Sequence, residues 1–311
     1  MSDKEAKPFY QELCRIVSRD GAVRQKEIMK NHTTFRVGGP AEYFVCPKDG
    51  QELAEVIALC RKENCPWFIL GNGSNLLVSD KGFSGVVISM EEGFGDIRVE
   101  ESLIVAGAGA LLSQVARRAC EAELTGLEFA AGIPGTLGGG AVMNAGAYGG
   151  ELKDVLTWVR VLNGEGREEQ LSVEDLELGY RTSSLQRSGA VVLEAGLRLT
   201  KGKKEEIKQK MEELAIARKE KQPLEYPSAG STFKRPQGYF AGKLIQDAGL
   251  RGKQIGGAQV SEKHCGFIIN RDHASAQDIW ELCACVVNEV RAQFKVELEM
   301  EVRVLGRFSG S

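Results

Sequence analysis

Residues 126–150 read GLEFAAGIPGTLGGGAVMNAGAYGG, and the interpretation of the whole chain starts from this stretch. Nine of its 25 residues are glycine, and it holds too few apolar side chains for a core helix. Glycine permits positive φ and lets the main chain approach a ligand closely. Successive bare N–H groups in such a run form concavities that suit phosphate oxygens without any lysine. The stretch therefore predicts a phosphate-binding loop.

The alternative interpretation of this stretch is a glycine-rich linker or surface loop. Flexible linkers are usually rich in glycine and serine, with few apolar residues that need burial. This stretch, in contrast, contains Ile133-Pro134, Leu137, Val142-Met143 and Tyr148. These residues favour a packed loop over a linker.

A second glycine-rich loop follows the apolar run at 67–70 and consists of Gly71, Asn72, Gly73, Ser74, Asn75 and Leu76. Leu76 stands where a dinucleotide-binding fingerprint needs glycine, and a strand follows instead of a helix, so a Rossmann interpretation fails on context. A tight turn and a phosphate loop both remain open. A third pair, Gly107 and Gly109, also lacks the last glycine of that fingerprint and predicts a packing turn. One nucleotide with a pyrophosphate would account for two or three such loops.

The 311-residue chain has the composition of a globular protein, with 42% hydrophobic and 27% charged residues. Its net charge of -3 gives no electrostatic footprint for nucleic acid, so we expect any polyanion that it binds to be small. The N-terminus lacks the apolar segment of a signal peptide, and no apolar run approaches the roughly 18 residues of a membrane span. We therefore expect a cytoplasmic protein without a membrane or nucleic-acid partner, and the sequence does not disclose its oligomeric state.

The eight cysteines are scattered and include no CxxC pair, which is typical of reduced thiols packed as small hydrophobic side chains. The three histidines are equally dispersed. We therefore expect no metal site.

Apolar periodicity predicts an α+β protein. A highly charged helix at 203–223, closed by Pro223, marks the main domain boundary near residues 215–222. We expect helices at 9–19, after Asp49, at the end of 97–124, at 241–250 and after Ser275, and strands in 31–47, 67–88, 97–107, 157–172, 190–199, 255–270 and 296–305.

In the expected last strand, 296–305, alternation places Glu297, Glu299, Glu301 and Arg303 on one face. A strand face that carries three carboxylates is usually exposed to solvent. Two other polar clusters, at 180–183 and 228–234, could join this face in a cleft. Ser231 is outside any GxSxG elbow and has no histidine placed as its base, so we expect a pocket serine that delivers a proton or packs, and not a nucleophile.

Eight motifs, in order from Asn31 to Gly306, together resemble the UDP-N-acetylenolpyruvoylglucosamine reductases of bacterial peptidoglycan synthesis. They are NHTTFRVGG, LGNGSNLLVSDKGF, AGIPGTLGGGAVMNAGAYG, GYRTS, PSAGSTFKRP, AGKLIQDAGLRG, SEKHCGFIIN and LEMEVRVLG. The resemblance implies a two-subdomain FAD-binding module of the vanillyl-alcohol-oxidase type, followed by an α+β substrate-binding domain. The expected domains are 1–90, 91–218 and 219–311, and the strand at 296–305 belongs to the last of these or returns to the FAD module. The short passage between Ser183 and Pro227 resembles the subclass without a tyrosine-bearing insertion.

By the same resemblance, FAD is the cofactor and NADPH the co-substrate, and hydride passes from NADPH to FAD and on to the β-carbon of an enolpyruvyl ether. Arg181 and Glu301 match the residues that stabilise the substrate carboxylate, and Ser231 matches the general acid that protonates the α-carbon. The implied FAD-binding residues are Gly71, Asn72, Gly73, Ser74, Asn75, Leu76, Gly135, Thr136, Gly139, Ala141, Asn144 and Gly146, with the Thr34–Gly39 turn nearby.

Lys234, Lys243 and Gln246 are candidates for the UDP diphosphate and sugar, and ordinary surface residues are an equal alternative. His264 has no role beyond packing that the sequence supports. Two rival functions stay open: a flavin oxidase or dehydrogenase of an alcohol or sugar, and a nucleotide-binding protein without catalysis.

Overall fold

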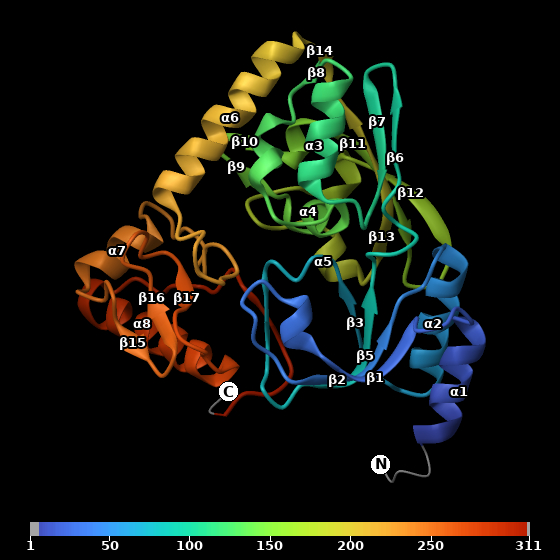
Figure 1. The fold of residues 1–311 in the computed structure, drawn as a ribbon, viewed down its shortest axis with the longest axis horizontal. Helices are drawn as coiled ribbons and strands as arrows, with labels where there is room; N and C mark the ends of the chain where they lie inside the picture. Colours follow the sequence, from blue (N-terminus) through green and yellow to red (C-terminus); the bar gives the residue numbers. More distant parts are fainter. Residues whose placement is uncertain (1–5, 310–311) are drawn as a thin grey trace. The chain divides into compact units, whose positions relative to one another are not determined.

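The computed structural model describes residues 6–309, which fold into two compact units (Figure 1). Within the described residues, unit 1 comprises 6–25, Tyr43–Asn72 and Gly85–Ala217, and unit 2 comprises Lys26–Glu42, Gly73–Ser84 and 218–309. Along the chain, the boundaries between the units fall inside strands β1 (Val23–Ile28), β2 (Pro40–Val45) and β5 (Phe83–Ser89), inside helix α6 (Lys204–Lys221), and between Asn72 and Gly73 in a loop. No helix among residues 6–309 is long and apolar enough to cross a lipid bilayer.

The N-terminal part of unit 1 contains helices α1 (Ala6–Ile16) and α2 (Gly50–Lys62). The Asp49 carboxylate caps α2 by accepting a hydrogen bond from the N–H of Glu52 at 2.9 Å. Strand β3 (Trp67–Leu70) lies parallel to β5 in a sheet with the order β1-β2-β5-β3. The predicted strand-to-loop step at Leu70–Gly71 is therefore confirmed.

An antiparallel five-stranded sheet with the order β12-β11-β13-β7-β6 forms the rest of unit 1. Helix α3 (Leu112–Glu121) packs against β6 and β7, and helix α4 (Leu137–Met143) packs against β7 and β13 (Figure 1). Its strands are β6 (Ile97–Glu100), β7 (Leu103–Gly107), β11 (Leu156–Leu162), β12 (Glu168–Ser172) and β13 (Val191–Arg198). Short elements complete the unit: β8 (Leu124–Thr125), β9 (Gly146–Ala147), β10 (Gly150–Glu151), α5 (Leu185–Ser188) and β14 (Thr200–Lys201). The strands predicted within 97–107 and 157–172 are confirmed, and in each range they pair as an antiparallel hairpin.

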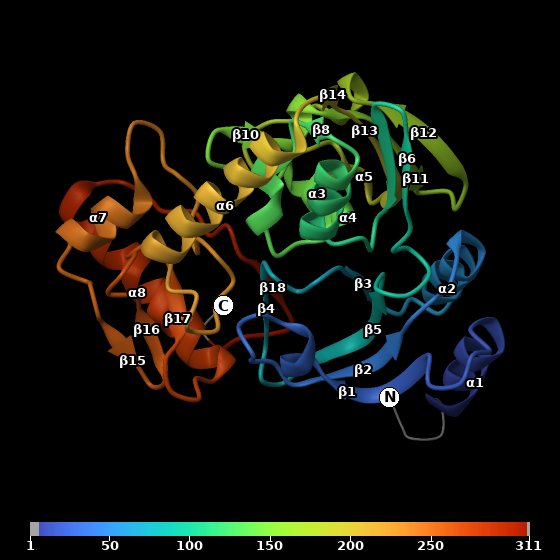
Figure 2. The same ribbon diagram turned by 45° about the horizontal axis from the view of Figure 1, so that its top comes forward.

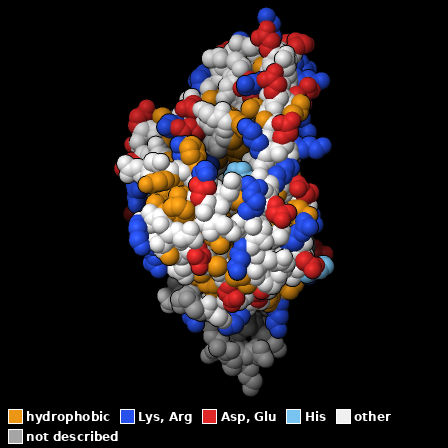
Figure 3. All heavy atoms as spheres, turned by 90° about the vertical axis from the view of Figure 1, so that its left-hand side faces the viewer, with side chains coloured by type: hydrophobic (Ala, Val, Ile, Leu, Met, Phe, Trp, Pro, Cys, Tyr) orange, Lys and Arg blue, Asp and Glu red, His pale blue; other side chains and the backbone are white. Residues whose placement is uncertain are grey.

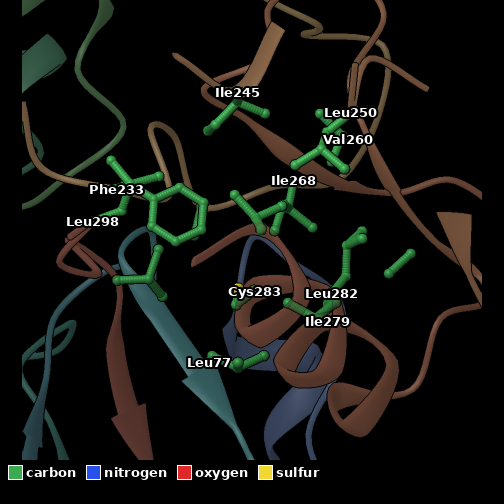
Figure 4. Packing of buried hydrophobic residues seen from close by; sticks show 14 of the residues in the cluster. Leu77, Phe233, Ile245, Leu250, Val260, Ile268, Ile279, Leu282, Cys283 and Leu298 are labelled. Carbon is green, nitrogen blue, oxygen red and sulfur yellow. The ribbon is translucent and has the colours of Figure 1, made fainter. Parts of the chain in front are cut away.

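Unit 2 is built around helices α7 (Ala241–Asp247) and α8 (Ala276–Phe294) and a three-stranded antiparallel sheet. The sheet contains β15 (Gln254–Ile255), β16 (Ala258–Val260) and β17 (Ile268–Asn270). Apolar side chains from the helices and the sheet interlock with Leu77 and Phe233 in one core (Figure 4). Strand β18 (Arg303–Leu305) lies parallel to β4 (Leu76–Val78), as Figure 2 shows.

Three expectations about the fold are wrong, and the first is the strand expected at the start of 31–47. A 3-10 turn, η1 (Met29–His32), and an irregular loop occupy this region, and the strand lies upstream as β1. Arg36 has a φ of +55°, and the Thr33 hydroxyl donates to the carbonyl of Val37 at 2.9 Å, so the loop folds back on itself. Phe35 and Val37 enter the core from this turn, and their burial imitates the alternation of a strand.

The second error concerns 126–150, which contains the helix α4 that its composition appeared to exclude. The helix packs by its backbone, because a Cβ on Gly138 would lie 2.8 Å from Cβ of Ala108. Glycine lowers helix propensity by about 1 kcal/mol per residue, but it permits this closeness. The periodicity of large apolar residues is therefore a poor guide to this element.

The third error is the length of the last strand, since only Arg303–Leu305 is regular. Before it, Met300 forms an isolated antiparallel bridge with Phe233. The chain then pairs with β4 instead. The alternation of buried and exposed side chains shifts by one residue at this point, so Val304 is 39% exposed and Leu305 only 7%. The acidic face predicted for 296–305 therefore ends at Glu301.

Asp80 ties the loop after β4 to helix α8, since its two carboxylate oxygens accept hydrogen bonds from the N–H groups of Ala276 and Gln277, each at 2.9 Å. We predict that Asp80→Ala lowers the free energy of unfolding by about 1 kcal/mol, the usual effect of losing a helix cap. Urea unfolding followed by circular dichroism measures this loss. The exposed α2 variant Glu55→Ala is the control, and an equal loss in both variants would contradict the prediction.

Candidate functional site

The end of β3 meets the N-terminus of α4 within unit 1. Thr136 caps α4 by accepting a hydrogen bond from the N–H of Gly139 at 3.4 Å. A Cβ on Gly71 would lie 2.5 Å from the Thr136 hydroxyl oxygen, so any side chain at this position would have to displace Thr136 or the loop. The side-chain amide of Asn72 donates to the carbonyl of Pro134. The structure thus brings together the two glycine-rich stretches that the sequence analysis singled out.

The sequence predicts free backbone N–H groups for binding phosphate in this stretch. The N-terminus of α4 does not provide them. The N–H of Leu137 donates to the carbonyl of Ala110 at 2.8 Å, and the N–H of Gly138 donates to that of Ala108 at 2.9 Å. These carbonyls belong to the turn after β7, so the prediction of a packing turn at Gly107 is confirmed. With the N–H of Gly139 bonded to Thr136, the first N–H groups of α4 are all occupied by protein atoms.

The remaining part of the second loop lies in unit 2, beside the turn at 33–39. The N–H of Thr34 donates to the carbonyl of Gly73 at 3.2 Å. The side-chain oxygen of Thr34 is buried and has no hydrogen-bond partner among the described residues. A pocket of about 360 Å³ lies in the same segment, lined by Lys30, Asn31, Thr33 and Arg36. The two cations that line this pocket, and separately the orphaned Thr34 hydroxyl beside Gly73, are groups of the kind that bind the phosphates of a dinucleotide such as FAD.

Besides Thr136, three of the expected cofactor residues contribute buried side chains. Leu76 is 3% exposed and belongs to β4, and Ala141 is fully buried in α4. Asn144 is also fully buried, and its carboxamide bonds to Glu151, Lys153 and Gly179. These side chains therefore pack within the protein.

Arg181 lies at the tip of a tight turn in unit 1. Its backbone is left-handed, with φ of +54°, and its guanidinium stands over the ring of Tyr180. One guanidinium nitrogen donates to the carbonyl of Gly146 at 3.2 Å. A half-buried arginine held in this way presents a planar cation that suits a carboxylate.

Ser231 and Glu301 come from two neighbouring segments of unit 2. The N–H of Glu301 donates to the carbonyl of Thr232 at 2.8 Å, one residue after the exposed Ser231. The side-chain amide of Asn75 donates to the carbonyl of Glu301 at 3.1 Å. The structure therefore places Glu301 between the segment that begins at Ser231 and the end of the second glycine loop.

The candidate substrate residues Lys234, Lys243 and Gln246 all have protein partners. Lys234 pairs with Glu299, Lys243 pairs with Asp247 one helical turn further along α7, and Gln246 accepts a hydrogen bond from Arg251 at 2.6 Å. Figure 3 shows lysine and arginine side chains interspersed with acidic ones over the face that includes α7. The equal alternative, that these are ordinary surface residues, stays open.

Thr232 and His264 hold the segment that contains Ser231. No motif in the sequence indicates this role for either residue. Thr232 is fully buried, its hydroxyl accepts a hydrogen bond from the N–H of Ile268 at 2.9 Å, and its N–H donates to the carbonyl of Gly266. The Nδ1 atom of His264 accepts from the N–H of Gly266 at 3.1 Å. Burial lowers the pKa of His264 below its ordinary value.

Comparisons with known proteins agree with this architecture. Residues 41–172 match the model of an FAD binding domain, and residues 222–305 match the C-terminal domain of UDP-N-acetylenolpyruvoylglucosamine reductase. A reductase of that name from Lachnoclostridium phytofermentans is 54% identical over 300 residues, which cover 95% of this chain and 96% of the relative. The chain is therefore an FAD-dependent oxidoreductase.

Solved structures extend the comparison. The UDP-N-acetylenolpyruvylglucosamine reductase of Thermus caldophilus matches with a TM-score of 0.78 and 37% identity, over 91% of this chain and all of that one. The chain belongs to the UDP-N-acetylenolpyruvoylglucosamine reductase family. A 4-ethylphenol oxidase from Gulosibacter chungangensis shares the fold alone, with a TM-score of 0.50 and 13% identity over 64% of this chain and 43% of that one. The predicted FAD-binding module of the vanillyl-alcohol-oxidase type is confirmed.

We predict that Gly71→Ala weakens FAD binding about tenfold or more, equivalent to about 1.4 kcal/mol. The added methyl group must displace Thr136 or the 71–72 loop, since it would lie 2.5 Å from the threonine oxygen. Titration of the apoprotein with FAD, followed by flavin fluorescence, measures the affinity. Gly95→Ala is the matched control, because a Cβ at Gly95 meets no atom within 4 Å. Unchanged affinity in Gly71→Ala would refute this packing argument.

His264 predicts a pH dependence of stability. Because its pKa is lowered in the folded state, the unfolded chain binds more protons below the ordinary histidine pKa of about 6.5. The contribution of neutral His264 to the free energy of unfolding is therefore present above about pH 6.5 and is lost as the pH falls below that value. We expect His264→Gln to flatten the loss of unfolding free energy between about pH 7 and pH 5.5, measured by urea unfolding. The exposed His273→Gln is the control, and identical slopes in the wild type and His264→Gln would contradict the prediction.

Proposed function

We propose that this chain reduces the enolpyruvyl ether of UDP-N-acetylglucosamine to UDP-N-acetylmuramate, a step of peptidoglycan precursor synthesis, with NADPH as the reductant. The observation that carries the proposal is similarity over nearly the whole chain to reductases of that name, including 54% identity to the Lachnoclostridium relative. The reaction would take place in the bacterial cytoplasm. Both partners of the protein would be small molecules.

The residues that would hold FAD are Gly71–Asn72, Gly73–Asn75 and Gly135–Gly139. The contact of Gly71 with Thr136 and the orphaned Thr34 hydroxyl support this assignment. Leu76 and Ala141 would contribute by packing, and Asn144 and Gly146 by their backbone alone. When bound, FAD supplies the redox chemistry, taking a hydride from NADPH and delivering it to the β-carbon of the substrate.

Arg181 would bind the carboxylate of the enolpyruvyl group. Negative charge accumulates on the α-carbon and its carboxylate when the β-carbon accepts hydride, so a fixed cation there stabilises the transition state more than the ground state. Glu301 would act on the same carboxylate. Losing one such stabilising group typically slows an enzyme about 100- to 1,000-fold.

Ser231 would deliver the proton that completes the reduction at the α-carbon. Its segment is held by the buried Thr232, whose hydroxyl and backbone N–H and C=O groups are all hydrogen-bonded. An exposed hydroxyl on a fixed backbone suits proton delivery, because geometry comes before pKa in general acid catalysis. Lys234, Lys243 and Gln246 remain candidates for the UDP group.

The domain assignment is part of the proposal. Residues 1–90 and 91–218 would form the two FAD-binding subdomains, and 219–311 the substrate-binding domain. The parallel pairing of β18 with β4 supports the alternative in which the last strand returns to the FAD module.

The flavin spectrum tests the proposed function. Under anaerobic conditions, NADPH should bleach the flavin absorbance, and UDP-N-acetylglucosamine enolpyruvate should restore it. Protein that takes up no FAD, or reduced flavin that oxygen reoxidises and this substrate does not, would overturn the proposal in favour of a rival function.

We predict that Ser231→Ala slows reoxidation by the enolpyruvyl substrate about 100- to 10,000-fold, because the proton donor is lost. Reduction by NADPH should be nearly unchanged, since it needs no proton at the substrate carbon. Stopped-flow absorbance measures both half-reactions separately. Equal losses in the two half-reactions would argue against proton delivery by Ser231.

A further inference from the structure

The turn that presents Arg181 is short and closed at its base. The N–H of Gly179 donates to the carbonyl of Thr182 at 3.1 Å, and the N–H of Thr182 donates back at 3.3 Å. Tyr180 and Arg181 therefore occupy the tip, where Arg181 takes a φ of +54°. A residue other than glycine keeps a left-handed backbone only where its surroundings fix it. The hydrogen bonds within the turn supply part of that constraint, and contacts from outside the turn add to it.

Asn144 connects the end of α4 directly to the base of this turn. It is the C-terminal cap of α4, fully buried, with a left-handed backbone of its own. Its amide nitrogen donates to the carbonyl of Gly179 at 3.0 Å and to the carboxylate of Glu151 at 2.7 Å. Its amide oxygen accepts from the N–H of Lys153 at 2.9 Å. Both ends of the carboxamide are engaged by protein, which leaves it little capacity to hold a ligand.

Two further side chains bind the other side of the turn to the last turn of α4. The hydroxyl of the fully buried Ser183 donates to the carbonyl of Val142 at 2.7 Å. The amide of Gln186 donates to the same carbonyl at 2.9 Å and to the carbonyl of Arg181 at 3.0 Å. Since the guanidinium of Arg181 also bonds to Gly146, the base, backbone and side chain of the turn are all tied to residues 142–146.

We infer that Asn144 is a positioning residue for Arg181, acting through the carbonyl of Gly179. The inference rests on the proposed function, in which Arg181 binds the substrate carboxylate. Arginine has a long, flexible side chain, so a guanidinium aimed by a fixed turn loses less freedom on binding than one on a loose loop. Asn144 thus determines the position of the Arg181 guanidinium, and its own side chain does not need to contact FAD or substrate.

Asn144→Gly is the sharpest variant, because glycine keeps the left-handed backbone and removes only the carboxamide. We expect reoxidation by UDP-N-acetylglucosamine enolpyruvate to slow about 10- to 100-fold, the effect of a reacting group misplaced by about 1 Å. Calorimetry should show weaker binding of this substrate to the oxidised holoenzyme. Reduction by NADPH and FAD content should match the wild type. Loss of FAD or equal slowing of both half-reactions would overturn the inference.

Thr157→Val is the matched control, since it removes one side-chain hydrogen bond, to the carbonyl of Gly196 at 3.0 Å, within the same unit. It should leave both half-reactions unchanged. Gln186→Met provides a second variant in case Asn144→Gly does not fold, with a smaller loss confined to reoxidation. A Gln186→Met protein with unchanged reoxidation would count against the inference.

A double-mutant cycle separates positioning from a general structural effect. If Asn144 acts through Arg181, Asn144→Gly should change reoxidation by no more than about twofold in an Arg181→Ala background, the margin within which independent effects add. Full additivity would overturn the inference and leave the proposed function intact. An Arg181→Ala variant that reoxidises normally would instead refute the role of Arg181 itself, and with it the inference.

Discussion

Two backbone hydrogen bonds join the N-terminus of α4 to the turn after β7, and the candidate site of unit 1 depends on them. The N–H groups of Leu137 and Gly138 donate to the carbonyls of Ala110 and Ala108, in the turn after β7. A side chain at Gly138 would force the helix away, because its Cβ would lie 2.8 Å from that of Ala108. Once docked, α4 places Thr136 against Gly71 at its N-terminus and Asn144 under the Arg181 turn at its C-terminus.

Much of the fold could be predicted from the sequence, because most elements bury a face of large apolar residues. The caps of α2 and α8, at Asp49 and Ser275, could also be predicted, because a short polar side chain just before an apolar stripe marks the start of a helix. Helix α4 was not predictable in this way, since its stability comes from close backbone packing and not from an apolar stripe. The last strand was overestimated because burial alternates along 296–302 even though the backbone there lacks a regular partner.

The candidate site was less accessible to reasoning from residues alone. Spacing left three carboxylates equivalent on the last segment, and only resemblance to the family singled out Glu301. The structure adds how Glu301 is held, through Thr232 and Asn75. The role of Asn144 depends on contacts with residues 179 and 151–153, which a local pattern does not reveal. Glycine-rich composition indicated a phosphate loop, whereas α4 uses its N–H groups for packing.

The most direct test of this account is a crystal structure of the holoenzyme with UDP-N-acetylglucosamine enolpyruvate bound. The account predicts FAD against Gly71–Asn72 and Gly135–Gly139, the substrate carboxylate on the guanidinium of Arg181, and the Asn144 carboxamide still bonded to Gly179. A carboxylate bound elsewhere, or an Asn144 side chain turned towards FAD, would contradict it.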